Sequence, residues 1–444
     1  MSIFQSKDHD KPALTLKKTL LTWLPLAASW LLMSMELPAI NAVVARLPNP
    51  EVNLAAYGGV VNPIVQIIVA PVIMLLVAST ALCRDWGSYQ KLKKFTLVMG
   101  GVLTGLHLLI AFTPLFDFIV NRLLQAPPEV VEPARIGLII ISPWTLAVAY
   151  RRFQQGTMIH FGHAHMVGET TVVRLLVVAV VLMIGIVVKT IPGTILAGIA
   201  QGLGVSFEAI YAGLRIRKIY PEIKAAPTAE KNLSLARFNS FYLPLAVTTL
   251  LLNFWQPLIS GAVSRMPDPL ESLAVWSVVN GLLFMFRAPG VAYNEVVVAL
   301  LEGPQSFHVL RKFARLISVT MAGIGLVFML SPLSRLWFAS IANLPPSLAE
   351  IARISLMIGL PLTILSVLIS FYQGIIVSLG VTGPVAEAVV VYLLSLGALL
   401  ISGVVTEAVK GVYVASAAFT FAYLMQCVWL WVRSRKQRLA LSLG

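Results

Sequence analysis

Two charged side chains stand inside long apolar stretches of the sequence. Glu36 follows the run LPLAASWLLMSM, and Arg287 lies two residues before Pro289 in a second apolar run. Charges at such depths are costly in a membrane, so they face protein or water and often serve a pathway through the bilayer. A guanidinium group suits the planar geometry of carboxylate and phosphate. We therefore consider Arg287 a candidate for binding an anion and Glu36 a candidate for coupling or charge balance.

Both residues also have structural explanations, which the sequence leaves open. Arg287 would form an ion pair with Glu295 two turns later, or with Glu36, and Glu36 would cap a helix break at Pro38.

Polar side chains at helical spacing extend these candidate sites. Steps of three and four residues place a stripe on one helical face, facing protein or a water-filled cleft. That stripe consists of Gln201, Gly204, Glu208, Tyr211 and Arg215. The candidate substrate-binding residues are Arg287, Asn253, Gln256, Asn41, Gln66 and Asn294. The candidate coupling or charge-balancing residues are Glu36, Glu295 and Glu208. Asn62, one turn before Gln66, is expected to bond between helices.

Other reactive residues form no catalytic pattern. His160, His163 and His165 precede Glu169, but their spacing is not that of a zinc site, which favours a solvated loop over a metal site. The lone His107 is expected to be a hydrogen-bonded packing residue, and the nearby Gly101 and Gly105 to form a close-packing face. No phosphate-binding loop of the Gly-x-x-x-x-Gly-Lys type is present. We expect no catalytic residues, no metal, no cofactor and no enzymatic activity.

Composition identifies the class of protein that must position these residues. Hydrophobic residues make up 58% of the 444 residues, charged residues 12%, and the mean hydropathy is +0.86. These values predict an all-α polytopic membrane protein. Twelve apolar segments are long enough to span a bilayer. They cover residues 17–45, 54–83, 95–118, 134–150, 172–191, 193–214, 238–262, 272–300, 314–338, 350–377, 384–404 and 410–432.

An internal repeat divides the chain into two halves. Pro25 lies on Pro244 and Pro38 on Pro257 at an offset of 219, and Pro71 lies on Pro289 at an offset of 218. Because proline kinks apolar helices, matching prolines predict matching helix shapes. We expect two pseudo-twofold related six-helix bundles, residues 1–217 and 238–444, joined by a cytoplasmic linker at 218–237.

The basic residues predict the orientation. Most lysines and arginines, including Arg151 and Arg152, fall on one side if both termini are cytoplasmic, which agrees with the positive-inside rule. The net charge of +14 is therefore a topology signal. Because the cations are spread over short loops, we expect no nucleic-acid partner. We expect a multi-pass protein of the cell (inner or plasma) membrane, surrounded by membrane lipids, with a monomer as the working hypothesis.

The duplicated halves with matching broken helices resemble the multidrug/oligosaccharidyl-lipid/polysaccharide (MOP, MATE-like) exporter superfamily, and within it the progressive ankylosis protein family. The matching stretches are Pro25-Leu26 to Asn41, His107 to Ala111 with Asn121-Arg122-Leu123, Gln256-Pro257 to Arg265, Pro289 to Glu295 with a basic residue before the proline, and Lys312-Phe313 to Pro332. Shorter loops and the lack of a long acidic C-terminal tail suggest a bacterial relative.

The resemblance implies an alternating-access exporter of small organic or phosphorylated anions, such as citrate-like carboxylates, nucleotides and pyrophosphate. It also implies that Arg287 occupies the family's basic position before the helix 8 proline, and Glu295 an acidic position. Three alternatives stay open: a proton- or sodium-coupled MATE-like antiporter of drugs or cations with Glu36 as its coupling residue, a lipid flippase, and a membrane scaffold without a substrate.

Overall fold

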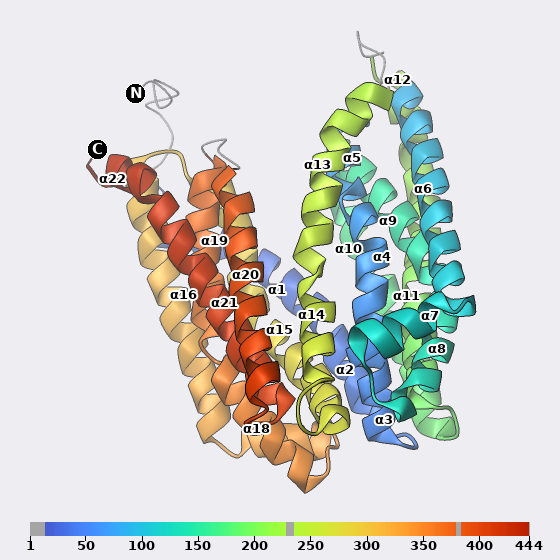
Figure 1. Cartoon of the computed structure of the whole chain (residues 1–444). Coiled ribbons are helices and arrows are strands. Elements are labelled where there is room, and N and C mark those ends of the chain that lie inside the picture. Colours follow the sequence, from blue (N-terminus) through green and yellow to red (C-terminus); the bar gives the residue numbers. More distant parts are fainter. Residues whose placement is uncertain (1–13, 228–234, 379–382, 444) are drawn as a thin grey trace. The chain divides into compact units, whose positions relative to one another are not determined.

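The computed structural model describes residues 14–227, 235–378 and 383–443, and all secondary structure within them is helical. The elements of the first half are α1 (Leu16–Ser34), α2 (Glu36–Val44), α3 (Pro50–Leu54), η1 (Ala55–Val61), α4 (Asn62–Ile73), α5 (Leu75–Leu82), α6 (Trp86–Phe112), α7 (Leu115–Asp117), η2 (Phe118–Leu124), α8 (Pro128–Ile141), α9 (Pro143–His160), α10 (Ala164–Val188), α11 (Gly193–Arg215), η3 (Ile216–Ile219) and α12 (Tyr220–Ala225) (Figure 1).

The second half repeats most of this order. Its elements are α13 (Leu235–Asn253), α14 (Trp255–Val263), α15 (Pro269–Leu300), α16 (Pro304–Leu330), α17 (Leu333–Leu336), η4 (Trp337–Ile341), α18 (Pro346–Gly359), α19 (Leu362–Ser378), α20 (Gly383–Thr406), α21 (Gly411–Arg433) and α22 (Arg435–Leu443).

The number of membrane spans agrees with the twelve predicted. By length and apolar composition, the described residues hold eleven candidate spans, and a twelfth if α8 and α9, which are bent by 42°, are one span. The predicted segment at 134–150 is shorter than the observed pair α8 and α9, which begins at Pro128 and ends at His160. The helix breaks before Pro143, and α8 carries the charged residues Glu129, Glu132 and Arg135, which lower the hydropathy of its first part. Arg135 pairs with Asp117 at 2.6 Å, which explains how this charged stretch is tolerated.

The structural repeat is closer than the sequence repeat. Helices α6, α8 and α11 begin and end 218 residues before α16, α18 and α21. The breaks after α1 and after α13, at Met35 and Phe254, are 219 residues apart. Non-glycine residues with left-handed φ recur as the pairs Asn49/Asp268, Gln125/Asn343 and Lys189/Glu407. Because such a conformation is uncommon outside glycine, its recurrence at fixed spacing shows one backbone design used twice.

Two compact units form, and their composition differs from the two sequence halves. One unit consists of Met1–Ala39 with Val278–Gly444, and the other of Ile40–Ser277. Within the first unit α1 packs against α16, and within the second α13 and α14 pack against α4. Helix α1 of the first sequence half therefore belongs to the unit formed mainly by the second half. Helices α13 and α14 of the second half belong to the unit formed mainly by the first half. The predicted division of the chain into bundles at residues 1–217 and 238–444 describes the sequence repeat and stays a prediction.

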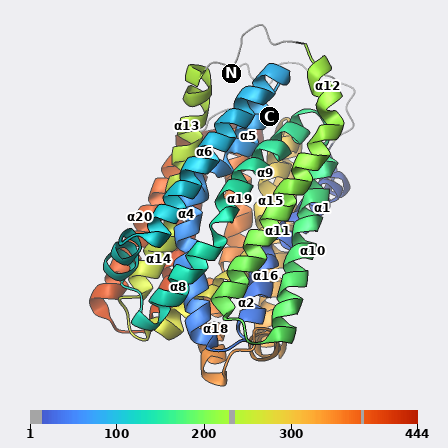
Figure 2. The same ribbon diagram turned by 90° about the vertical axis from the view of Figure 1, so that its right-hand side faces the viewer.

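Unit Ile40–Ser277 is organised around α9, which lies between α6 and α11 (Figure 2). Helix α6 begins at Trp86, nine residues before the predicted start of this span. A capping box explains the difference, because the Asp85 side chain accepts a hydrogen bond from the Ser88 amide at 2.6 Å and Ser88 Oγ accepts one from the Asp85 amide. Such caps extend helices into polar sequence.

Two further predictions concern local structure. The predicted linker at 218–237 is helical over η3 and α12, with Ile219 and Ile223 buried, and its residues 228–234 lie outside the described residues. The expected close-packing face at Gly101 and Gly105 is wrong for the described residues, because no atom lies within 4 Å of a Cβ built at either glycine.

Candidate functional site

Arg287 lies in α15, and its guanidinium is held by aromatic rings within unit Met1–Ala39 with Val278–Gly444. One terminal nitrogen donates to the hydroxyl of Tyr423 in α21 at 2.7 Å. The guanidinium carbon lies 4.6 Å from the Tyr423 ring centroid and 5.1 Å from that of Phe419. Cation–π contacts of this kind stabilise a desolvated cation. Among the described residues, the groups that orient this side chain are neutral.

No carboxylate of the described residues forms an ion pair with Arg287, although the residue is only 8% exposed. Its Nε is buried and has no hydrogen-bond partner. The ion pairs considered for Arg287 with Glu295 and Glu36 are thus absent from this structure. A buried cation without a counter-charge is energetically costly, and an anionic ligand would offset that cost.

The other candidates of this unit lie on α15 and at the α1–α2 break. Asn294, two turns after Arg287, donates its side-chain amide to the Ser370 carbonyl at 3.1 Å. Glu295 is exposed and accepts from the indole nitrogen of Trp30 at 3.1 Å. Glu36 is the first residue of α2, directly after the helix break at Met35.

In the other unit, three amides form a chain between α4 and α14. Gln66 donates to the oxygen of Asn62 at 3.4 Å, and Asn62 donates to the oxygen of Gln256 at 3.5 Å. Asn62 thus bonds between helices as expected, and two candidate substrate-binding residues are brought together. Asn253 bonds within its own helix, donating to the Thr249 carbonyl at 2.9 Å.

Asn41 is 1% exposed and is satisfied by Ser277 of α15. Its side-chain nitrogen donates to the Ser277 carbonyl at 2.9 Å, and its oxygen accepts from Ser277 Oγ at 3.2 Å. Since both ends of the amide are occupied, a substrate would have to displace Ser277 to reach it.

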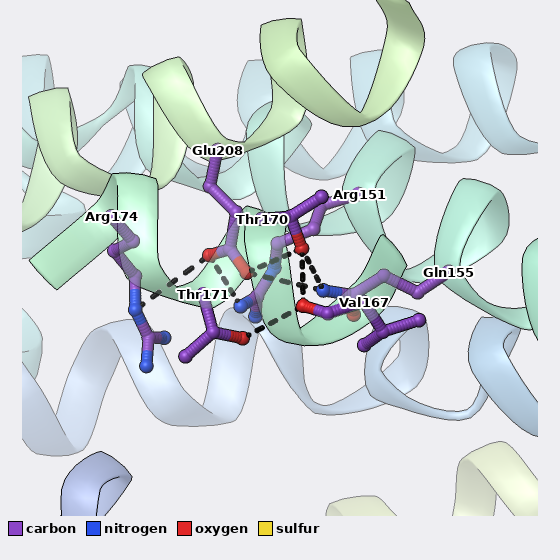
Figure 3. A network of polar contacts seen from close by, with 7 residues as sticks. All are labelled: Arg151, Gln155, Val167, Thr170, Thr171, Arg174 and Glu208. Carbon is purple, nitrogen blue, oxygen red and sulfur yellow. Dashed lines mark hydrogen bonds and ion pairs between the residues drawn. The ribbon is translucent and has the colours of Figure 1, made fainter. Parts of the chain in front are cut away.

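Glu208 sits in a buried polar cluster of unit Ile40–Ser277 (Figure 3). Its carboxylate accepts from Arg151 of α9 at 2.7 Å and lies 3.6 Å from Nε of Arg174 of α10. Gln155 donates to it at 3.1 Å and Thr170 at 3.4 Å. The exposed fractions of the three charged side chains are 0%, 7% and 8%, so the cluster joins three helices away from solvent.

The polar stripe on α11 faces protein along its length, as predicted. Gln201 accepts from the Tyr57 hydroxyl at 2.5 Å, and Gly204 lies against Val178 and Arg174. Arg215 at its end pairs with Glu169 at 2.5 Å.

Sequence reasoning missed the partners of Glu208. The predicted span ends at residue 150 and places Arg151 at the cytoplasmic surface, whereas α9 continues to His160. The signal that would have found it is the spacing of Arg151 and Gln155, one turn apart on a helix that carries few other charges. Arg174 is a cation within the apolar segment at 172–191, but nothing in the sequence identifies its partner.

His107, His160 and His163 serve packing and local bonding. His107 is fully buried and bonded at both ring nitrogens, to Thr145 at 3.0 Å and the Leu138 carbonyl at 2.9 Å, which confirms the prediction. The predicted loop around His160 is mostly helical. His160 bonds the Thr80 carbonyl and His163 bonds Glu222, each at 2.8 Å. Within the described part of the chain, no group of His, Cys, Asp and Glu is placed to hold a metal.

Both cysteines are buried and free. Burial raises the pKa of the Cys83 thiol to about 12, so it stays protonated at neutral pH and is a poor nucleophile.

Comparison with solved structures assigns the fold. The chain is similar to the inward-facing conformation of a multidrug resistance MATE family transporter of the MOP superfamily, with a TM-score of 0.73 and 14% identity over 95% of this chain and 99% of that one. It is also similar to a MOP superfamily transporter from Pyrococcus furiosus (TM-score 0.63, 14% identity, 97% of each chain) and to the lipid II flippase MurJ (TM-score 0.59, 14% identity, 93% and 89%).

These similarities show that the all-α chain, with its eleven or twelve candidate membrane spans among the described residues, has the fold of MATE transporters. At 14% identity they define the fold alone. No protein-family model matches the chain. No curated protein sequence matches it either.

Proposed function

We propose that the chain is an alternating-access transporter that exports small organic or phosphorylated anions, with Arg287 as its central anion-binding residue. The observation that carries this proposal is the buried guanidinium of Arg287 without an ion-pair partner among the described residues. A carboxylate or phosphate would supply the missing charge and fit the planar fork of donors. Citrate-like carboxylates, nucleotides and pyrophosphate, the substrates implied by the resemblance to the progressive ankylosis protein family, all carry such groups.

Further features support an anion over a cation. The P. furiosus transporter of similar fold is described as having a binding pocket of reverse polarity that suggests a different function. In this chain Val69 occupies the repeat position of Arg287, so the scaffold itself does not need a cation there. We place both termini in the cytoplasm and assign Glu36, Glu295 or Glu208 to coupling or charge balance.

The test is uptake of radiolabelled citrate, ATP and pyrophosphate into proteoliposomes. Arg287→Ala should lower uptake by at least tenfold, because a charge-assisted hydrogen bond contributes about 1.5–3 kcal/mol. Arg287→Lys should retain part of the uptake, since lysine keeps the positive charge but lacks the planar, forked donors of the guanidinium group. Tyr423→Phe should cost about 1 kcal/mol, or roughly fivefold, by releasing one guanidinium nitrogen.

Arg335→Ala is the matched control, because Arg335 is exposed and belongs to the same unit. Anion uptake that survives Arg287→Ala at the level of the Arg335→Ala protein would reject the proposal.

A second candidate, proton- or sodium-coupled cation antiport, is favoured by the fold of the multidrug transporters. Here Glu36 at the α1–α2 break would carry the coupling proton, and Glu36→Gln would abolish pH-driven efflux of a cationic dye while Arg287→Ala would not. The MurJ-like fold makes lipid flipping a third outcome, detected as transfer of a fluorescent lipid between leaflets. A scaffold would show no flux of any of these.

A further inference from the structure

Four arginines surround a pocket of about 420 Å³ in unit Met1–Ala39 with Val278–Gly444. Arg311 and Arg315 come from α16, and Arg435 and Arg438 from α22, the helix that follows the last span and packs against α16 and α19 (Figure 1). Arg311 and Arg315 are one turn apart and share a helical face, an arrangement that is unfavourable for like charges. Helix stability therefore does not explain why positive charge is concentrated at this pocket.

No carboxylate of the described residues offsets this charge. None of the four arginines forms an ion pair with an acidic side chain in the part of the chain that the structure describes, and no acidic residue lines the pocket. Burial, together with the positive charges of Arg311 and Arg435, lowers the pKa of Arg438. Mutual repulsion of this kind is relieved when an anion binds among the arginines.

The position of one arginine in the pocket wall, Arg438, is also fixed by specific contacts. Nε of Arg438 donates to Ser434 at 3.1 Å, and one of its terminal nitrogens donates to the Trp431 carbonyl at 2.7 Å. Its guanidinium carbon lies 5.3 Å from the ring centroids of both Tyr372 and Trp431. These contacts fix one guanidinium in the wall, while Arg311, Arg315 and Arg435 are exposed and available to a ligand.

The surroundings match a membrane–water boundary. Helix α22 begins two residues after the last candidate span, and it carries Arg435, Lys436 and Arg438 beside an apolar side with Leu441 in the core. Trp431 and Leu439 at the pocket are each 49% exposed. Amphipathic helices and tryptophans of this kind lie at the headgroup level, and the charge distribution predicts this end of the span to be cytoplasmic.

We propose that this pocket binds a phosphate-bearing anion, and that its apolar and aromatic rim selects the headgroup of an anionic phospholipid over a soluble phosphate. Guanidinium groups bind phosphate oxygens in a bidentate manner, and basic pockets between helices on the cytoplasmic side attract anionic headgroups. The rim would contact the glycerol backbone and the first part of the acyl chains. The site is separate from the Arg287 site and does not depend on what the protein transports.

The lipid arm of the test uses the full-length protein in nanodiscs that mix phosphatidylglycerol with phosphatidylcholine, with retained lipid counted by native mass spectrometry. The double variant Arg311→Gln/Arg315→Gln should lower preferential retention of phosphatidylglycerol by about fivefold per arginine. Both side chains are exposed, so folding should be preserved. The matched control is Lys93→Gln/Lys94→Gln, which removes the same charge near the repeat position, since Lys93 lies 218 residues before Arg311.

The soluble arm measures calorimetric binding of inorganic phosphate to the same proteins in pure phosphatidylcholine. A lipid headgroup site is supported if preferential retention of phosphatidylglycerol is lost only in the arginine double variant and the unmodified protein shows no saturable binding of phosphate. Saturable phosphate binding that requires the arginines, without a lipid preference, supports the anion site and overturns its assignment to lipid. Equal lipid retention in the two double variants, together with no phosphate binding, overturns the proposal.

Discussion

The indole nitrogen of Trp23 donates a hydrogen bond to the carbonyl oxygen of Pro289 at 2.9 Å. In the other unit the hydroxyl of Tyr242 donates to the carbonyl of Pro71. Trp23 and Tyr242 are repeat partners at an offset of 219, and Pro71 and Pro289 at 218. Each aromatic residue therefore bonds to the proline of the opposite half, and the two bonds fasten the exchanged helices α1 and α13.

Ring packing repeats the same relationship. Trp23 packs edge-on against Phe313 with centroids 5.9 Å apart, and Tyr242 packs edge-on against Phe95 at 5.6 Å. Phe95 and Phe313 are again repeat partners at 218.

Trp23→Phe should therefore weaken the packing of α1, because it removes the indole N–H while keeping an aromatic ring. We expect a loss of about 0.5–1.5 kcal/mol, the usual contribution of one hydrogen bond, read as a lower thermal unfolding temperature in detergent. The control is Trp30→Phe, seven residues later on the same helix, where the indole bonds to the exposed Glu295. Equal unfolding temperatures for the two variants would show that the Trp23 bond does not hold the helix.

Glu208→Gln should strongly destabilise unit Ile40–Ser277. The change removes the negative charge that faces Arg151 and Arg174 in a buried cluster, and breaking such a buried pair costs about 3–5 kcal/mol. Glu169→Gln is the comparison, since its pair with Arg215 is partly exposed and contributes about 0–1 kcal/mol. Thermal unfolding measures both. If Glu208→Gln unfolds like wild type but loses transport, the residue serves coupling and the structural interpretation fails.

Gly156→Ala should separate α9 from α5. A Cβ at this position would lie 2.0 Å from Ser79 Oγ and 2.3 Å from the Leu76 carbonyl oxygen, so a helix backbone would have to shift. We expect a loss of about 1–3 kcal/mol from overpacking, seen as a lower unfolding temperature. Gly101→Ala, which meets no atom within 4 Å, should instead be neutral or gain up to about 1 kcal/mol of helix propensity. A lower unfolding temperature for Gly101→Ala than for Gly156→Ala would contradict this packing of α9 against α5.

The sequence was sufficient to predict the spans and the repeat, because hydropathy and proline positions are local properties. It predicted that α1 and α13 are alike, but similarity does not say which partner each helix packs against, so the exchange between halves could not be foreseen. The same limit applies at Glu208. Its helical stripe was recognised, whereas Arg151 and Arg174 reach it from other helices and follow only from tertiary packing. Arg287 was found because a cation in an apolar run is conspicuous without knowledge of its neighbours.

The reciprocal exchange of α1 for α13 and α14 bears on how such a chain arose. Two identical six-helix ancestors that traded their first helices would have formed a domain-swapped dimer, in which neither subunit was complete without the other. Fusion of two gene copies would then have preserved the swap within a single polypeptide. In such a chain neither copy could be lost alone. The two copies here differ in charge, because Val69 occupies the repeat position of Arg287.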